Sequence, residues 1–239
     1  MKTLVSYSGG MDSTALLLSL IADKHEVECI NFYYGSKHNA SERARAEQIT
    51  KELGVKLTEI DMDFINRLFK SDLLQSGGAV PEGHYAEENM KKTVVPFRNG
   101  IMLSIATGYA ESIDANQVAI ANHAGDVFCY PDCRQEFITP MAEAMVHGTF
   151  DGIRLYAPFT YITKSQVAKI GCDLNYGVMM NSWSCYAPHT TTDERKIHCG
   201  RCGTCTERIE AFILAGIEDT TIYADKDFAV KLLKEKGSI

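Results

Sequence analysis

The apolar positions of the chain alternate between short, partly β-branched runs and longer segments with helical spacing. The runs that predict strands are Lys2–Tyr7, Val27–Tyr34, Val55–Ile60, Gln117–Ala121 and Ile153–Ala157. The segments that predict helices are Asp12–Ala22, Ala40–Leu53, Gly100–Ser112, Glu136–His147, Thr163–Gly171, Thr206–Ala215 and Asp225–Lys236. Strands that alternate with helices over short connections predict an α/β fold, in which helices cover both faces of a parallel sheet.

Two stretches break this rhythm. Residues 61–96 carry paired glycines and a proline, which are turn signals, and a long irregular insert of this kind is often a substrate loop or lid. Residues 183–205 are rich in Cys, Gly and His and show no strand or helix period. We therefore expect a main domain over residues 1–180 and a smaller C-terminal segment, packed on the same domain, over residues 181–239.

The composition is that of a globular protein with a substantial core. Of the 239 residues, 45% are hydrophobic and 23% are charged, which excludes disorder, collagen and coiled coil. No apolar run approaches the ~20 residues of a membrane-spanning helix, and the N-terminus lacks the pattern of a signal peptide, so we expect a cytoplasmic protein with no membrane partner. The net charge of −7 disfavours tight binding of nucleic acid, although a local basic patch would still permit it.

A glycine-containing hexad joins the first predicted strand to the first predicted helix. Its residues are Ser8, Gly9, Gly10, Met11, Asp12 and Ser13. The glycines allow a tight turn, the helix N-terminus offers unpaired N–H groups, and the two serines add hydroxyl donors, which together suit a phosphate or pyrophosphate. The Walker A lysine and the dinucleotide fingerprint are both absent. The competing interpretation is an ordinary strand–helix turn capped by Asp12 or Ser13.

The hexad resembles the PP-loop of the N-type ATP pyrophosphatases. The resemblance implies a Rossmann-like parallel sheet and cleavage of ATP between its α and β phosphates, with the loop holding the leaving pyrophosphate. The nucleotide-binding residues that it implies are Ser8, Gly9, Gly10, Met11, Asp12, Ser13 and Thr14. The missing lysine fits this chemistry, because no γ-phosphoryl group is passed on.

Four clustered cysteines indicate a metal site. Cys185, Cys199, Cys202 and Cys205 have the spacing C-x13-C-x2-C-x2-C, which suits a closed, structural Zn²⁺ site of four thiolates. Glycines that follow two of these cysteines favour zinc over an iron–sulfur cluster, although the iron–sulfur alternative is not excluded. His198 is a competing ligand. The remaining cysteines (Cys29, Cys129, Cys133 and Cys172) are scattered and are interpreted as packing residues or left unassigned.

Three further segments narrow the resemblance to the 7-cyano-7-deazaguanine synthase family of the queuosine pathway. They are residues 95–99 (Val-Pro-Phe-Arg-Asn), residues 130–134 (Tyr-Pro-Asp-Cys-Arg), and residues 183–186 (Trp-Ser-Cys-Tyr) together with the later cysteines. One run departs from the family pattern: in Tyr33–His38, Tyr34, Gly35 and His38 match but Tyr33 and Ser36 do not. The departure allows a divergent branch, such as one that stops at the amide or feeds DNA modification.

The resemblance implies an ATP-dependent ligase that acts on 7-carboxy-7-deazaguanine and ammonia, with Mg²⁺ on the phosphates. ATP would adenylate the carboxylate, ammonia would displace AMP, and a second ATP would drive the amide to the nitrile. The candidate catalytic residues are Ser8, Asp12, Ser13, Arg98 and Lys164. The candidate substrate-binding residues are Asn99, Asp126, Asp132 and Arg134, where Arg134 is also a candidate cation and Asp132 would accept hydrogen bonds from the base.

Three alternatives stay open. The first is a PP-loop enzyme that adenylates tRNA for direct base modification, which the acidic charge disfavours. The second is a related deazaguanine enzyme that forms the amide. The third is a non-catalytic nucleotide sensor or zinc-stapled adaptor, which the intact hexad disfavours. The sequence leaves a homodimer open.

Overall fold

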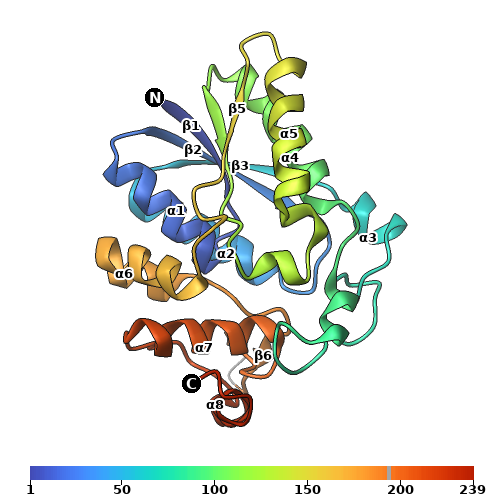
Figure 1. Cartoon of the computed structure of the whole chain (residues 1–239), viewed down its shortest axis with the longest axis vertical. Coiled ribbons are helices and arrows are strands. Elements are labelled where there is room, and N and C mark those ends of the chain that lie inside the picture. Colours follow the sequence, from blue (N-terminus) through green and yellow to red (C-terminus); the bar gives the residue numbers. More distant parts are fainter. Residues whose placement is uncertain (193–194) are drawn as a thin grey trace.

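The computed structural model describes residues 1–192 and 195–239, and its centre is a parallel sheet of five strands (Figure 1). The strands are β1 (Lys2–Ser6), β2 (Glu26–Tyr33), β3 (Lys56–Asp61), β4 (Gln117–Ala119) and β5 (Arg154–Tyr156). They lie in the order β3-β2-β1-β4-β5. All five follow the hydrophobic runs, and the parallel α/β sheet that the sequence predicts is confirmed.

Helices cover both faces of this sheet. They are α1 (Met11–Ala22), α2 (Asn39–Leu53), α4 (Arg98–Ser112), α5 (Gln135–Gly148) and α6 (Lys164–Asn181). In Figure 1, α1 and α6 lie on one side of the sheet and α4 and α5 on the other. Successive residues of a strand point to opposite faces, so the buried Val5 packs with α1 and α6 while the buried Leu4 packs with α4 and α5.

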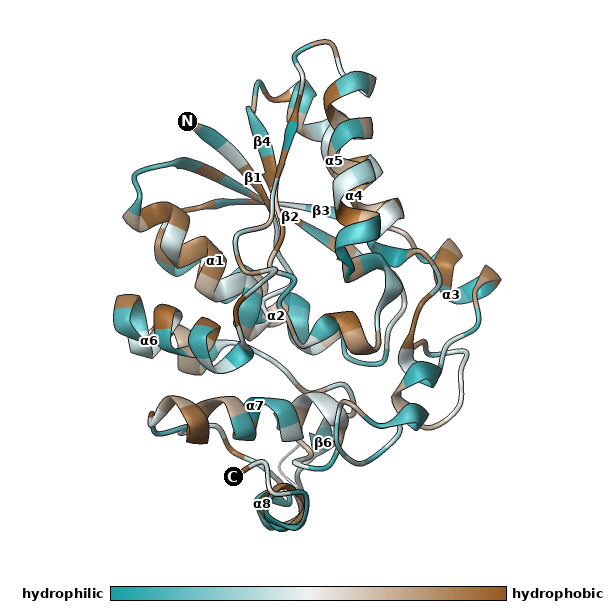
Figure 2. Ribbon diagram, viewed as in Figure 1, coloured by the Kyte–Doolittle hydropathy of each residue, from teal (hydrophilic) through white to brown (hydrophobic). Residues whose placement is uncertain are grey.

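Helix α1 is enclosed rather than amphipathic. Eight of its twelve residues are buried, and its ribbon is apolar over most of its surface in Figure 2. The reason is its position between the sheet and α6, which leaves little of the helix facing water. The loop at the N-terminus of α1 is therefore connected to a helix that is mostly buried.

The strand order places this loop at a reversal of topology. From β1 the chain crosses to β2 and β3 on one side, and then returns to β4 and β5 on the other. Val5 of β1 pairs with Cys29 of β2 and with Ala119 of β4. Connections that leave β1 and β4 in opposite directions open a crevice at the carboxyl ends of these strands, which is where doubly wound α/β proteins bind ligands.

The insert over residues 61–96 is mostly irregular, as predicted, but it contains the short helices α3 (Phe64–Leu68) and η1 (Glu88–Thr93). It is anchored by Lys37, whose Nζ donates to the carbonyl oxygens of Asp72, Leu74 and Gly78 at 2.6 Å each. Two further single-turn helices, η2 (Asp126–Phe128) and η3 (Pro131–Cys133), lie between β4 and α5.

Helix α6 begins as predicted and runs further than predicted. The Thr163 hydroxyl accepts from the Gln166 amide while the Gln166 side chain accepts from the Thr163 amide, so Thr163 is the N-cap and forms a capping box with Gln166. The sequence pattern ends at Gly171, yet the helix continues to Asn181. Asn175 has a non-helical φ of −158°, and this kink breaks the apolar spacing on which the prediction depended.

The C-terminal segment contains one pair of strands that the sequence did not predict, the antiparallel β6 (His189–Thr190) and β7 (Lys196–Ile197). The two helices predicted after them are confirmed as α7 (Gly203–Ala215) and α8 (Lys226–Glu235). Helix α7 lies along α6, and Phe212 joins the core that α1 and α6 form (Figure 1). The division at residues 180 and 181 stays a prediction. Across residues 1–192 and 195–239, every helix is too short or too polar to span a bilayer.

Candidate active site

The hexad forms a tight turn that only glycine permits at its second position. Gly9 has a φ of +81°, and a Cβ on it would lie 2.6 Å from the Glu42 carbonyl oxygen and 2.7 Å from the Ala46 amide of α2. The hydroxyls of Ser8 and Ser13 lie 3.2 Å apart, and the Gly10 amide donates to Ser8 Oγ at 3.0 Å. Backbone and hydroxyl donors therefore gather in one small turn.

The N-terminus of α1 is left open for an anion. Gly10 is the N-cap, and no side chain caps the helix, so the interpretation of Asp12 or Ser13 as a helix cap is wrong. The first N–H groups of a helix have no intrahelical partner. The side chains of Met11 and Thr14 are buried, which leaves their backbone as the part that a ligand in the cleft could meet.

A buried ion pair lies beside this helix end. Lys164, the first residue of α6, places its Nζ 3.1 Å from Asp12 Oδ2 and 2.7 Å from Glu207 Oε2 of α7. Burial opposes the charge of Asp12, but Lys164 and His123 outweigh it, so the pKa of the Asp12 carboxyl lies below its usual value. Burial also opposes the charge of Lys164, yet Asp12 and Glu207 raise the pKa of its ammonium. Both groups are charged at neutral pH.

His123 completes the cluster from the loop that follows β4. Its Nδ1 accepts from the Gly125 amide at 3.0 Å, which places the proton of the neutral ring on Nε2. Nε2 lies 3.6 Å from a carboxylate oxygen of Asp126 and 3.6 Å from one of Glu207. Burial, opposed by Lys164, raises the pKa of the Glu207 carboxyl.

Arg98 lies in a group of aromatic rings on the other side of the hexad. Its Nη1 donates to the Tyr34 hydroxyl at 3.0 Å, and its guanidinium carbon lies 5.6 Å from the Tyr34 ring centre and 5.8 Å from that of Tyr130. The ring of Tyr186 stacks on His38 with centroids 4.6 Å apart. Planar side chains of this kind suit a planar ligand.

Two adjoining cavities meet at the hexad. The walls that they share are Ser8, Gly10, Asp12, Glu42, Asp126, Tyr130 and Tyr186. The sheet-edge cavity lies over the carboxyl ends of β1, β2 and β4 and includes Asn31, Arg98 and Asn99. The second cavity, bounded by the insert and by α7, includes Met90, Lys164 and Glu207.

Two of the predicted substrate residues lie away from both cavities. Asp132 Oδ2 accepts from the Asn99 amide at 2.8 Å, so this carboxylate satisfies the N-terminus of α4. Arg134 is exposed, and its Nε donates to the Val127 carbonyl. Asn99 and Asp126 do line the cleft. The predicted contacts of all four residues with substrate stay predictions, and the geometry favours Asn99 and Asp126.

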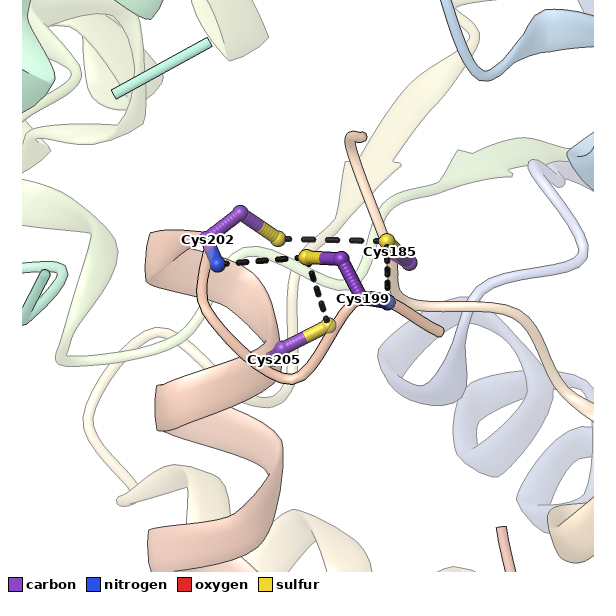
Figure 3. A group of neighbouring side chains, drawn as sticks. All are labelled: Cys185, Cys199, Cys202 and Cys205. Atoms are coloured by element: carbon purple, nitrogen blue, oxygen red, sulfur yellow. Dashed lines mark hydrogen bonds between the residues drawn. The ribbon is translucent and has the colours of Figure 1, made fainter. Parts of the chain in front are cut away.

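The four cysteines converge on one point, as Figure 3 shows. Their sulfur atoms all lie within 4.8 Å of one another, with Cys185 and Cys202 4.0 Å apart and Cys199 and Cys205 3.9 Å apart. A tetrahedral ion with bonds of about 2.3 Å to sulfur needs such separations. His198 is no part of this group, because its Nε2 accepts from the Ser184 amide at 3.0 Å. The donor set therefore fits zinc with four thiolates.

Backbone amides support these sulfurs. The amides of Arg201 and Cys202 each donate to Cys199 Sγ at 3.3 Å, and the Cys199 amide donates to Cys185 Sγ at 3.3 Å. Gly200 permits this turn with a φ of +78°, and a Cβ there would lie 2.2 Å from the Asp225 carbonyl oxygen. Such N–H···S bonds are the outer-shell contacts that orient metal ligands.

Several residues of the site escaped the sequence analysis. They include His123, Glu207, Glu42, Tyr34 and Tyr186, which line the cleft or contact Lys164. Tyr34 and Tyr186 lie in segments that match the family pattern, and His123 follows β4 at the carboxyl edge of the sheet, so these three had a local signal. Glu207 is read from the sequence as one more polar residue of a helix.

The fold and the loop define the class of this protein: a PP-loop nucleotide-binding α/β protein whose C-terminal segment carries a four-thiolate cluster. The chain belongs to the family described as "Queuosine biosynthesis protein QueC", whose model matches residues 2–216. This confirms the resemblance drawn from the hexad and the three segments, and it makes the chain a member of an enzyme family that uses ATP.

Named relatives agree over nearly the whole chain. A 7-cyano-7-deazaguanine synthase of Porphyromonas gingivalis strain W83 is 50% identical over 221 residues, which is 92% of this chain and 96% of its own. Proteins of the same name from Desulfotalea psychrophila and Rhizobium rhizogenes are 43% and 44% identical, covering 87% and 96% of this chain and 92% and 95% of theirs. The solved structure of a "predicted subunit of tRNA methyltransferase" from Methanocaldococcus jannaschii aligns with 72% of this chain and 74% of its own at a TM-score of 0.47 and 17% identity, too remote to bear on function.

Proposed function

We propose that this protein converts 7-carboxy-7-deazaguanine and ammonia to 7-cyano-7-deazaguanine with two molecules of ATP. A carboxylate oxygen attacks the α phosphorus and pyrophosphate leaves; ammonia then displaces AMP to give the amide. The amide oxygen attacks a second ATP, and loss of AMP gives the nitrile. Both substrate oxygens therefore end on AMP. The named relatives and the family description support this reaction.

The observation that carries the proposal is the open N-terminus of α1 beside a buried cation. Unpaired N–H groups, Ser8 and Ser13 offer donors to the leaving pyrophosphate, and Lys164 lies at the same end of the helix. Preorganised donors and cations stabilise the charge that develops at the α phosphorus and on the leaving group. Arg98 is a second cation, across the hexad.

We place ATP in the sheet-edge cavity and the deazaguanine in the second cavity. The carboxyl edge of β1 and β4 is the expected nucleotide position in a doubly wound sheet. The second cavity offers Met90 and Tyr186 as walls for a planar base, with Asp126 as an acceptor at its margin. The carboxylate of one ligand and the α phosphorus of the other would then meet over the hexad.

Mg²⁺ fits the residues at this point. Asp12 Oδ1 is buried and, among the described residues, has no hydrogen-bond partner, which leaves an anionic oxygen for a hard cation. In this proposal Asp12 helps to hold Mg²⁺, which neutralises phosphate charge when it is bound. We further propose that ammonia is the nitrogen donor and that the four cysteines bind zinc. The protein would act as a homodimer in the reducing cytoplasm.

A single assay with labelled substrate tests the reaction. The protein is mixed with ATP, Mg²⁺, ammonium and 7-carboxy-7-deazaguanine whose carboxylate carries ¹⁸O, and the products are weighed by mass spectrometry. We expect the nitrile, lighter by about 36 mass units than the unlabelled acid plus ammonia and by about 40 when both carboxylate oxygens are ¹⁸O, with label in AMP; adenylation drives each loss of one oxygen as the equivalent of water. An amide would indicate the amide-forming alternative. In a parallel mixture that contains bulk tRNA in place of the deazaguanine, AMP attached to tRNA would indicate the tRNA-adenylating alternative.

A further inference from the structure

The ammonium of Lys164 is held between carboxylates from two distant parts of the chain. Asp12 belongs to the hexad, whereas Glu207 belongs to α7 in the C-terminal segment. The contact with Glu207 is the shorter one, 2.7 Å against 3.1 Å. Glu207 is also the more buried partner, because its side chain is 8% exposed and that of Asp12 is 25% exposed. Glu207 is therefore the better-shielded anchor.

A lysine needs such an anchor to act as a fixed cation. Its side chain has four rotatable bonds and loses much freedom when the ammonium is held in one place. The capping box at Thr163 fixes the backbone of Lys164 but leaves these bonds free. Asp12 alone could not anchor the ammonium during the reaction, because Mg²⁺ at the hexad would compete for the same carboxylate.

Glu207 is itself fixed by the C-terminal segment. Helix α7 has Cys202 as its N-cap and carries Cys205 in its first turn, so two of the four clustered thiolates lie just before Glu207. The next residue, Arg208, is fully buried and donates to the Ser182 hydroxyl at 3.0 Å. The carboxylate of Glu207 thus projects from the first turns of α7, which are fixed by the cysteine cluster before it and by the buried Arg208 after it.

We propose that Glu207 is a positioning residue, which holds the Lys164 ammonium at the hexad and so connects the four-cysteine segment to the chemistry of the loop. The inference rests on the proposed function for its effect on turnover. It gives the C-terminal segment a part in the active site beyond stability. Glu207 lines the cavity in which we place the deazaguanine, but its proposed effect on the reaction passes through Lys164.

The primary test compares Glu207→Gln with Glu210→Gln. Glu210 is a matched control: it lies on the same helix, its side chain is 11% exposed against 8% for Glu207, and it faces His84 instead of the hexad. We expect Glu207→Gln to lower kcat for pyrophosphate release at least tenfold with the KM for ATP changed less than threefold, since misplacement by about 1 Å can cost 10²-fold. Glu210→Gln should stay within twofold of wild type. Equal effects of the two variants would overturn the proposal.

A double-mutant cycle separates positioning from general damage. Lys164→Met should lower turnover by about 10²–10³-fold, the loss expected for one preorganised donor. If Glu207 acts through Lys164, adding Glu207→Gln to Lys164→Met causes no further loss. Multiplied losses would assign Glu207 another role. Glu207→Asp, which keeps the charge, should recover part of the turnover and guards against a Gln variant that folds poorly.

A third measurement does not depend on the reaction. The folded protein is treated with acetic anhydride, and mass spectrometry of its peptides gives the rate at which Lys164 is acetylated. A slow rate shows that the ammonium is held. We expect labelling to be at least fivefold faster in Glu207→Gln and unchanged in Glu210→Gln. If wild type makes no pyrophosphate with the deazaguanine, the proposed function fails, while this labelling result still decides whether Glu207 holds Lys164. Unchanged labelling in Glu207→Gln refutes that role.

Discussion

At the scale of single residues, the Ser13 hydroxyl has a contact pattern that suits a phosphate ligand. It lies 3.2 Å from Ser8 Oγ and donates to the Gly10 carbonyl at 3.2 Å, so its removal breaks only local, replaceable bonds. We predict that Ser13→Ala lowers pyrophosphate release about 10²-fold or more while the unfolding free energy changes by about 1 kcal/mol. Coupled pyrophosphate detection and urea denaturation measure the two quantities.

A serine on the same helix is the control for this prediction. Ser19 donates to the Ala15 carbonyl at 2.8 Å and lies away from the cleft. Ser19→Ala should change stability by a similar amount and leave turnover unchanged. Full activity of Ser13→Ala would show that the hexad does not grip the phosphates through this hydroxyl.

Sequence reasoning at this scale succeeded where chemistry is contiguous. The hexad and the cysteines are close in sequence, and their spacing alone places donors or thiolates together. Glu207 and Lys164 are 43 residues apart, and nothing in either local sequence shows that they meet. Asp132 was assigned to substrate because it lies in a matching segment, and that assignment stays a prediction; the sequence did not show that its carboxylate accepts from the Asn99 amide at the N-terminus of α4.

At the scale of elements, the four-thiolate cluster should contribute directly to folding. Cys185 comes from the segment before β6, Cys199 from the turn after β7, and Cys202 and Cys205 from the start of α7, so an ion between them would tie these elements together (Figure 3). Metal-binding free energy of a structural site is folding free energy. We predict that Cys202→Ser loses the bound metal and several kcal/mol of unfolding free energy together, measured by elemental analysis and by denaturation.

Cys172 provides the matched control, because it lies outside the cluster. Cys172→Ser should keep one metal ion per chain and most of the stability. Wild-type protein that resists unfolding equally with and without a strong chelator would argue against a structural ion.

Helices and strands with a clear hydrophobic period were predicted well, and those stabilised by tertiary contacts were not. The five strands and the main helices match to within a few residues, apart from α6. The short helices of residues 61–96 have no period of their own, and they depend on buried anchors such as Leu73 and Met90. The second half of α6 was missed since Asn175 shifts the helical register at the kink.

At the scale of the whole molecule, a second buried ion pair makes the free energy of unfolding depend on pH in the acidic range. Asp219 Oδ1 lies 3.5 Å from Arg208 Nη2, with side chains 3% and 0% exposed. Burial opposes the charge of Asp219, but Arg208 and hydrogen bonds from Thr221 and Tyr223 outweigh it, so the pKa of the carboxyl lies below its usual value. The unfolded chain then binds the proton first, and stability that is present above about pH 4 is lost as the pH falls through the folded pKa.

We predict that the unfolding free energy falls as the pH is lowered from 5 towards 3, with a shallower slope in Asp219→Asn. That variant should be about 3–5 kcal/mol less stable at pH 7, because Arg208 loses its buried partner. Asp173→Asn, at an exposed ion pair with Lys169, should keep the wild-type slope. Urea titrations at a series of pH values measure all three, and identical slopes in the two variants would contradict the assignment.

The indole of Trp183 has a consequence for how the molecule can be observed. Its backbone amide donates to the Gly9 carbonyl at 2.9 Å, its ring N–H donates to the Cys185 carbonyl at 2.8 Å, and it is the one tryptophan of the chain. Fluorescence excited at wavelengths that only tryptophan absorbs therefore comes from a single indole, which lies between the hexad and the four cysteines. Ligand binding at the hexad and metal binding at the four cysteines can therefore both be followed by intrinsic tryptophan fluorescence, without an attached dye.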